Sequence, residues 1–123
     1  MLVKSSHSYA ETLSILRNAI VEAGNTLFAE IDQSAAAAKV GLTLRPTTLL
    51  VFGNPKGGTP LMDADPEFGL ELPLKILVWE EQTGIRVAYT PLAESAARYF
   101  ISGMDDRVEH IDAAVDALVC TVI

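Results

Sequence analysis

The sequence predicts an α+β domain in which one curved antiparallel sheet packs against long helices. Candidate strands at residues 26–32 and 47–52 are separated by a short alanine-rich segment, and those at 72–79 and 85–89 by residues 80–84 alone. Such short connections disfavour a doubly wound parallel sheet, in which a long helix follows each strand. Amphipathic patterns near both ends of the chain supply the helices that we expect to cover the apolar face of the sheet.

The N-terminal part of the chain predicts a strand followed by a helix. Residues 1–5 are apolar and β-branched enough for a short strand. Ser8 and Glu11 match a capping box, in which the serine oxygen accepts from one free helix N–H and the glutamate accepts from another. Apolar residues then recur at spacings of four, three and four, which predicts a helix ending near Gly24: Tyr9, Leu13, Leu16 and Ile20.

The next segment predicts two strands around a short helix. Residues 26–32 alternate as a strand does, and Phe28 on the second face predicts that this face is partly buried too. Residues 34–40 are rich in alanine, and Ser34 is the expected N-cap of a short helix. Residues 47–52 form a dense apolar and β-branched run that is typical of a central strand.

The second half of the chain predicts a hairpin and two helices. The strands at residues 72–79 and 85–89 pair antiparallel if Gly84 takes the positive φ of a tight turn. Residues 91–100 begin with proline and carry apolar side chains at helical spacing. Asp106 to Glu109 resembles a second capping box, and a long amphipathic helix follows, with apolar residues at Val108, Ile111, Val115, Leu118 and Val122.

Composition narrows the possible functions. The chain has 123 residues, half of them hydrophobic, which is enough for one core, so residues 1–123 are expected to form a single domain. The net charge of −7 opposes binding to nucleic acid and to anionic membrane surfaces. No apolar stretch is long enough for a membrane-spanning helix. The only cysteine, Cys120, is expected in the core and permits no internal disulfide, which favours the cytoplasm.

The most distinctive segment runs from Gly53 to Thr59. Residues 53–58 are too rich in glycine and proline to continue the preceding strand. Thr59 is the expected N-cap of a short helix that begins at Pro60 and ends before Pro66. Free N–H groups at such a helix start, with Lys56 beside them, could hold a carboxylate or a phosphate. The alternative is a sharp structural turn. The spacing is not that of a Walker A loop.

Other candidate groups are weaker. Asp32 and Glu30 could form a carboxylate pair for acid and base chemistry, although most such pairs on an acidic protein are simply solvated. His7 and His110 lack partners at ligand spacing, so neither a metal site nor a cofactor is expected. The candidate ligand-binding residues are therefore Asp32, Asn54, Lys56, Gly57, Gly58 and Thr59, and no catalytic residue is assigned.

Several short motifs, above all the string from Val51 to Met62, resemble the domain of unknown function 302 family, and the match covers about residues 9–89. The other matching segments are residues 31–32, 35–38, 44–46 and 72–75. The resemblance implies a TATA-binding-protein-like α+β fold with a sheet curved around a long C-terminal helix, often in a homodimer, but no activity. The family commonly carries a histidine after the aspartate that matches Asp32, whereas this chain has Gln33.

Three functions remain open at this point. The first is a module that binds a small ligand, anionic at the loop from Gly53 to Thr59, in a pocket between sheet and helix. The second is an enzyme acting on a small acidic metabolite, with Lys56 holding the anion and Asp32 transferring a proton. The third is a structural or regulatory homodimer that binds a partner protein, because so large an apolar fraction favours self-association.

Overall fold

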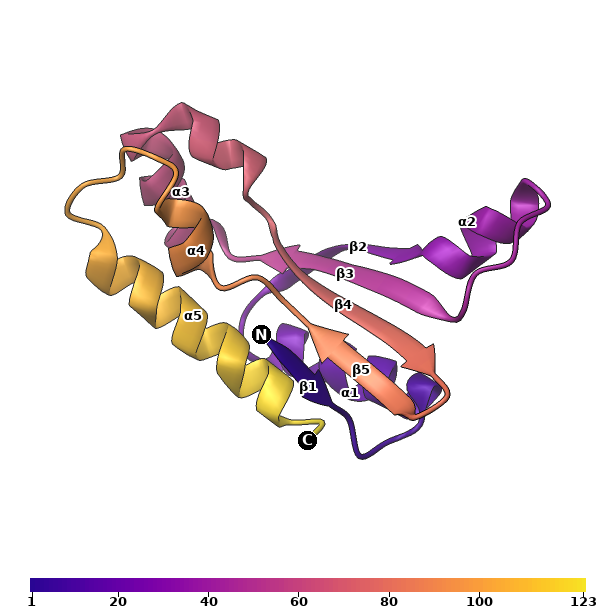
Figure 1. Ribbon diagram of the computed structural model, residues 1–123. Helices are drawn as coiled ribbons and strands as arrows, with labels where there is room; N and C mark the ends of the chain where they lie inside the picture. Colours follow the sequence, from indigo (N-terminus) through magenta and orange to yellow (C-terminus); the bar gives the residue numbers. More distant parts are fainter.

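The computed structural model describes residues 1–123 and places five strands in one antiparallel sheet of order β1-β5-β4-β3-β2 (Figure 1). Every neighbouring pair is antiparallel, and Gly84 has the expected positive φ, of 132°, in the turn between β4 and β5. The expected α+β class is therefore confirmed. The strands are β1 (Leu2–Lys4), β2 (Thr26–Asp32), β3 (Thr47–Gly53), β4 (Leu74–Glu81) and β5 (Gly84–Ala88).

Five α-helices and one short 3₁₀ helix complete the chain. They are α1 (Tyr9–Glu22), α2 (Gln33–Lys39), α3 (Pro55–Ala64), the 3₁₀ helix η1 (Pro66–Leu70), α4 (Leu92–Ala96) and α5 (Asp105–Cys120). None of these helices has the length and hydrophobicity required to cross a bilayer.

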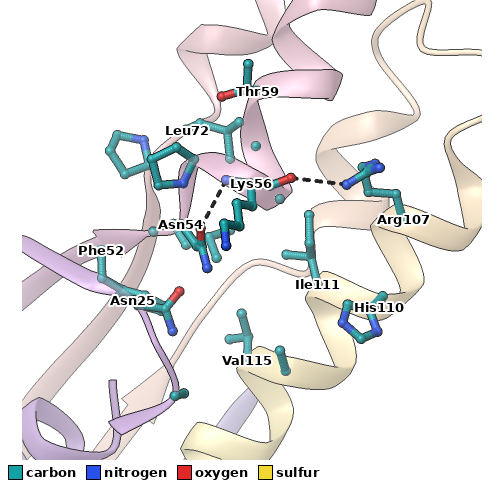
Figure 2. Close-up of a pocket in the computed structure, with 18 of the residues that line it drawn as sticks. Asn25, Phe52, Asn54, Lys56, Thr59, Leu72, Arg107, His110, Ile111 and Val115 are labelled. Atoms are coloured by element: carbon teal, nitrogen blue, oxygen red, sulfur yellow. Dashed lines mark hydrogen bonds between the residues drawn. The ribbon is translucent and has the colours of Figure 1, made fainter. Parts of the chain in front are cut away.

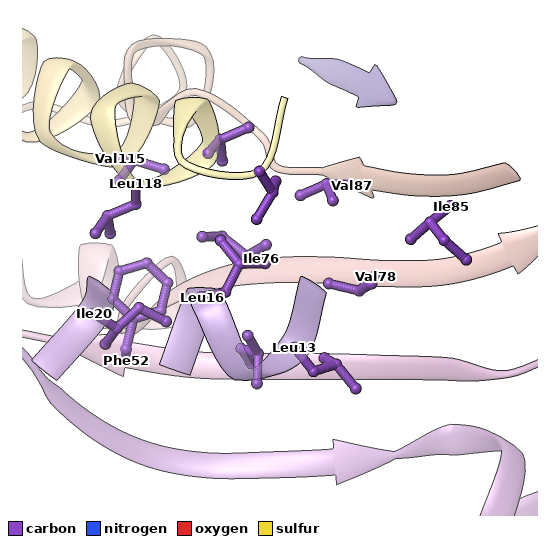
Figure 3. Close-up of a cluster of buried hydrophobic side chains, with 13 residues drawn as sticks. Leu13, Leu16, Ile20, Phe52, Ile76, Val78, Ile85, Val87, Val115 and Leu118 are labelled. Carbon is purple, nitrogen blue, oxygen red and sulfur yellow. The ribbon is translucent and has the colours of Figure 1, made fainter. Parts of the chain in front are cut away.

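Helices α1 and α5 pack against the same face of the sheet, as the two amphipathic patterns predict (Figure 3). Leu16 and Ile20 of α1 and Phe52 of β3 are at most 1% exposed. They contact the buried side chains that β4, β5 and α5 contribute to the same cluster. The 3.6-residue period of the helices and the two-residue period of the strands thus meet in one core.

A smaller cluster holds α3, η1 and α4 beside the first half of α5. Its buried members are Leu61, Phe68, Leu92, Ile101 and Val108. The ring of Phe68 meets that of Tyr99 edge to face, with 5.1 Å between the ring centres. This cluster places the start of α3 opposite α5, across the end of β3.

Residues 33–46, which we call the arm, connect the end of β2 to the start of β3 and project away from the rest of the molecule (Figure 1). No residue of α2 is buried. The expected Ser34 cap is wrong, because the carboxylate of Asp32 accepts from the N–H of Ala35 at 2.9 Å and from the hydroxyl of Ser34. Asp32 is the N-cap because its side chain reaches an N–H three residues ahead.

Three other expectations about burial and caps are wrong. Phe28 is 54% exposed, because the register of β2 against β3 shifts between Leu27 and Ala29 and turns the intervening side chain outward. Cys120 lies on the exposed side of α5. The expected capping box from Asp106 to Glu109 does not form: the N-cap position is Met104, and no side chain bonds there.

The helix expected over residues 91–100 is shorter in the structure, where α4 ends at Ala96. The N–H of Tyr99 bonds back only three residues, to the carbonyl of Ala96. The hydroxyl of Tyr99 donates to Glu71, which draws this segment toward η1. Tertiary contacts therefore end a helix that the local pattern would extend.

Candidate functional site

Helix α3 begins five residues before the expected start, at Pro55 rather than Pro60. The side-chain oxygen of Asn54 accepts from the N–H of Lys56 at 3.0 Å, and Pro55 takes the first helical position. Asn54 followed by Pro55 is the same cap-and-proline signal as Thr59 followed by Pro60, placed earlier in the chain. The prediction that Thr59 is the N-cap is therefore wrong.

Pro60 consequently lies inside the helix, where it has no N–H to give to the carbonyl of Lys56. The guanidinium of Arg107 replaces that donor, with 3.2 Å between its Nη1 and the Lys56 carbonyl oxygen (Figure 2). This bond joins α3 to α5. The basic side chain of Arg107 therefore lies at the mouth of the space between the two helices.

The two glycines of α3, Gly57 and Gly58, let neighbouring side chains pack close to the helix backbone, and their own backbone angles are ordinary. Neither Gly57 nor Gly58 has a positive φ. A Cβ atom on Gly58 would lie 3.1 Å from Cδ1 of Leu72, and one on Gly57 would lie 3.7 Å from Cδ1 of Ile111. The N–H groups of Gly57 and Gly58 both donate to the carbonyl of Asn54. The free N–H groups expected here for an anion are thus already bonded.

A pocket of about 510 Å³ opens between the start of α3, the start of β2, the end of β3, and α5 (Figure 2). Figure 2 shows Asn25, Phe52, Asn54 and Lys56 on one side of it and Ile111 and Val115 of α5 on the other. The other apolar lining residues are Ala23, Phe28, Pro55, Met62, Leu72, Pro73, Leu74, Ala114 and Leu118.

The charged residues at this pocket are both cationic, Lys56 and Arg107, and His110 also lines it. None of the sixteen aspartates and glutamates of the chain lines it. Lys56 takes part in none of the four ion pairs of the protein. On a chain of net charge −7, this combination concentrates positive potential in one partly apolar cavity.

The structure brings together five of the six predicted ligand-binding residues. Asn54, Lys56, Gly57, Gly58 and Thr59 all line the pocket.

Asp32 does not lie there, because it caps α2 at the opposite end of β2. The hydroxyl of Ser34, and after it the N–H of Ala35, stabilise the Asp32 carboxylate and lower its pKa.

Sequence reasoning missed the residues that α5 and the end of α1 contribute. Arg107, His110 and Ala114 recur at spacings of three and four, which places them on one helix face beside Ile111. The sequence shows this spacing, but only the fold brings this face of α5 close to Lys56.

His7 lies away from the pocket, with 3.6 Å between its Nδ1 and Oε2 of Glu11. Nowhere do three or more His, Cys, Asp or Glu side chains come together as a metal site would require.

Comparison with protein families and solved structures gives two consistent matches. The family model described as domain of unknown function DUF302 matches residues 1–118. The crystal structure of an uncharacterised conserved DUF302 protein from Bacillus stearothermophilus superposes with a TM-score of 0.91, covering 100% of this chain and 97% of that one. The two sequences are 16% identical, so this likeness shows the fold alone.

Comparison with curated proteins gives partial matches. The chain is 42% identical over 82 residues to proteins named fluoride-specific ion channel FluC 1 from Brucella suis and from Brucella abortus. The matched segment is 67% of this chain, 32% of the first relative and 30% of the second. The chain thus spans about a third of the length of these relatives.

Proposed function

The chain belongs to the DUF302 family, and we propose that it is a module that binds a small organic anion in the pocket between α3 and α5. The observation that carries this proposal is the uneven distribution of charge: cationic side chains line the pocket and carboxylates do not. Lys56 and Arg107 line it and no carboxylate does, on a protein with sixteen Asp and Glu residues and only nine Lys and Arg residues. A neutral ligand would not require this arrangement, whereas a carboxylate or phosphate ligand would gain from it.

The shape and lining of the pocket favour an anion with an apolar body. A volume of about 510 Å³ is within the range of pockets that hold small organic molecules. Lys56 supplies the charge, while Phe52, Val115 and Leu118 supply apolar surface. A ligand with a charged end and an apolar end would contact both sets.

The enzyme alternative has less support. It relied on Asp32 as a proton-transfer group beside Lys56, and the two residues lie at opposite ends of β2 and β3. No other carboxylate lines the pocket to take that role. We therefore propose binding without a reaction.

Titration with matched probes tests the proposal. We expect phenylacetate to bind and to raise the melting temperature, and its neutral analogue phenylacetamide to bind more weakly. The Lys56→Ala variant should lose roughly 1 kcal/mol of phenylacetate affinity through a lost charge-assisted contact. Its fold should persist, because the backbone carbonyl that holds Arg107 remains. Calorimetry measures both affinities.

Lys39→Ala is the matched control, because Lys39 is exposed on α2 and far from the pocket. Phosphate and fluoride complete the panel, the latter because the partial relatives are named fluoride-specific ion channels. Equal affinity for the acid and the amide, or equal loss in both lysine variants, would contradict the proposed function.

A further inference from the structure

The arm, residues 33–46, is an apolar projection that nothing in the chain covers. Val40 is 73% exposed, Leu42 65% and Leu44 43%. These three side chains follow α2, which itself buries no residue. Monomeric proteins seldom expose clustered large apolar side chains, and such clusters mark interaction surfaces.

A groove of about 500 Å³ with a mostly apolar lining lies between α4 and α5. Ala93, Ala97 and Phe100 line it, and Phe100 is 91% exposed. The charged residues at this groove are Asp105 and Glu109. They are four residues apart on α5 and therefore lie on one helix face.

The charges of the two surfaces are complementary. The arm holds Lys39 and Arg45 and no acidic residue, whereas the rest of the chain has seven basic and sixteen acidic residues. None of these four charged groups, Lys39 and Arg45 in the arm or Asp105 and Glu109 at the groove, joins one of the protein's ion pairs. Each surface therefore offers apolar area and unpaired charge of the sign opposite to the other.

We propose that the arm of one copy docks into the groove between α4 and α5 of a second copy. Figure 1 shows the arm at one end of the sheet and α4 and α5 toward the other, so the arm cannot reach the groove of its own chain. Two copies related by a two-fold axis make this contact twice, which closes the assembly as a dimer. Lys39 and Arg45 then face Asp105 and Glu109 of the partner copy.

Reversing the charges of each surface in turn tests this pairing. The arm variant, Lys39→Glu with Arg45→Glu, and the groove variant, Asp105→Lys with Glu109→Lys, should each self-associate at least about tenfold more weakly than the wild type. Mixed in equal amounts, the two variants should recover association as a heterodimer. In that pair both contacts again join opposite charges. Native mass spectrometry distinguishes the heterodimer by its mass.

Matched controls separate a specific contact from a general loss of charge or stability. Lys4→Glu with Lys75→Glu makes the same charge change outside both surfaces and should leave association unchanged. Leu42→Asp should weaken it, whereas Leu70→Asp, at a similarly exposed site outside the arm, should not. A wild type that stays monomeric into the millimolar range would overturn the proposal. So would a dimer that is insensitive to both reversals, or variants that do not recover on mixing.

Discussion

Lys56 and Arg107 are both basic residues of the pocket, but their side chains have different contacts. Arg107 bonds to the backbone carbonyl that Pro60 leaves without a helical donor, so its guanidinium holds α3 against α5. The ammonium of Lys56 joins no ion pair and remains available to a ligand. Substitution of Arg107 would therefore disturb the pocket itself, whereas substitution of Lys56 changes its charge alone.

The tyrosines give a prediction about alkaline pH. Burial, and after it the carboxylate of Asp116, raise the pKa of Tyr89 from 10.0 to about 12. Between these values the unfolded chain releases a proton that the folded chain keeps, so the free energy of unfolding falls as the pH rises. Denaturant unfolding at a series of pH values measures this slope, and Tyr89→Phe should make it shallower.

The pKa values of Tyr9 and Tyr99 shift in the same direction as that of Tyr89. Burial raises the pKa of Tyr9, and the hydrogen bond to Glu71 raises that of Tyr99. In a pH titration, the tyrosinate absorbance of the folded protein should therefore rise at a higher pH than that of the denatured chain. Coincident curves for the two states would show that these hydroxyls are as free as in solution.

At the residue scale, the sequence predicted types of site better than their exact positions. Asn54 and Thr59 both precede proline and both suit an N-cap, and the helix of the structure begins at the first of these signals. A carboxylate such as that of Asp32 suits both a ligand site and a helix N-cap, and in the structure Asp32 is a helix N-cap.

At the scale of elements, α3 is a helix with two glycines and two prolines among its ten residues. Its intrinsic helix propensity is poor, since both residue types disfavour helix interiors. Buried Leu61, the Asn54 cap and the Arg107 bond hold it in place. The strands and the two long helices could be predicted because local periodicity decides them, whereas α3, η1 and the shortened α4 depend on contacts that are distant in sequence.

The two neighbouring glycines of α3 yield a paired prediction. Alanine gains up to about 1 kcal/mol over glycine inside a helix, and this gain is common to both positions. A Cβ on Gly57 meets Ile111 at an ordinary distance, but one on Gly58 would press on Leu72 at 3.1 Å. We expect Gly57→Ala to stabilise the protein and Gly58→Ala to be less stable than Gly57→Ala by about 1 kcal/mol.

Chemical denaturation of both variants measures that difference. In a protein that already carries Leu72→Ala, the crowding side chain is gone. Adding Gly58→Ala to that variant should therefore raise the free energy of unfolding by the helix-propensity gain of alanine over glycine. Equal stabilities for Gly57→Ala and Gly58→Ala would contradict the crowding.

At the scale of the whole molecule, the sheet separates two surfaces. The pocket lies where β2 begins and β3 ends, and the arm lies where β2 ends and β3 begins. The sequence predicted a pocket between sheet and helix and an excess of apolar residues. It could not show that α5 brings Arg107 and His110 to the pocket, nor which apolar side chains stay exposed, three of them in the arm, because both follow from long-range packing.

Because of this separation, the arm should be removable without loss of the fold or the pocket. None of residues 33–45 is buried, and Asp32 already pairs with Thr48 across the β2–β3 ladder. Replacing residues 33–45 by an Asn-Gly turn keeps Pro46, whose carbonyl accepts from the N–H of Glu80 at 3.0 Å. We expect the free energy of unfolding to change by less than about 1 kcal/mol, since surface changes of this kind remove little packing.

The shortened chain should keep the phenylacetate affinity of the full chain and lose self-association. Calorimetry and sedimentation measure the two properties on the same sample. Retained self-association would place the dimer contact outside the arm. Loss of phenylacetate binding in a chain that still folds would show that the arm and the pocket are coupled through β2 and β3, which the separate packing of these two ends argues against.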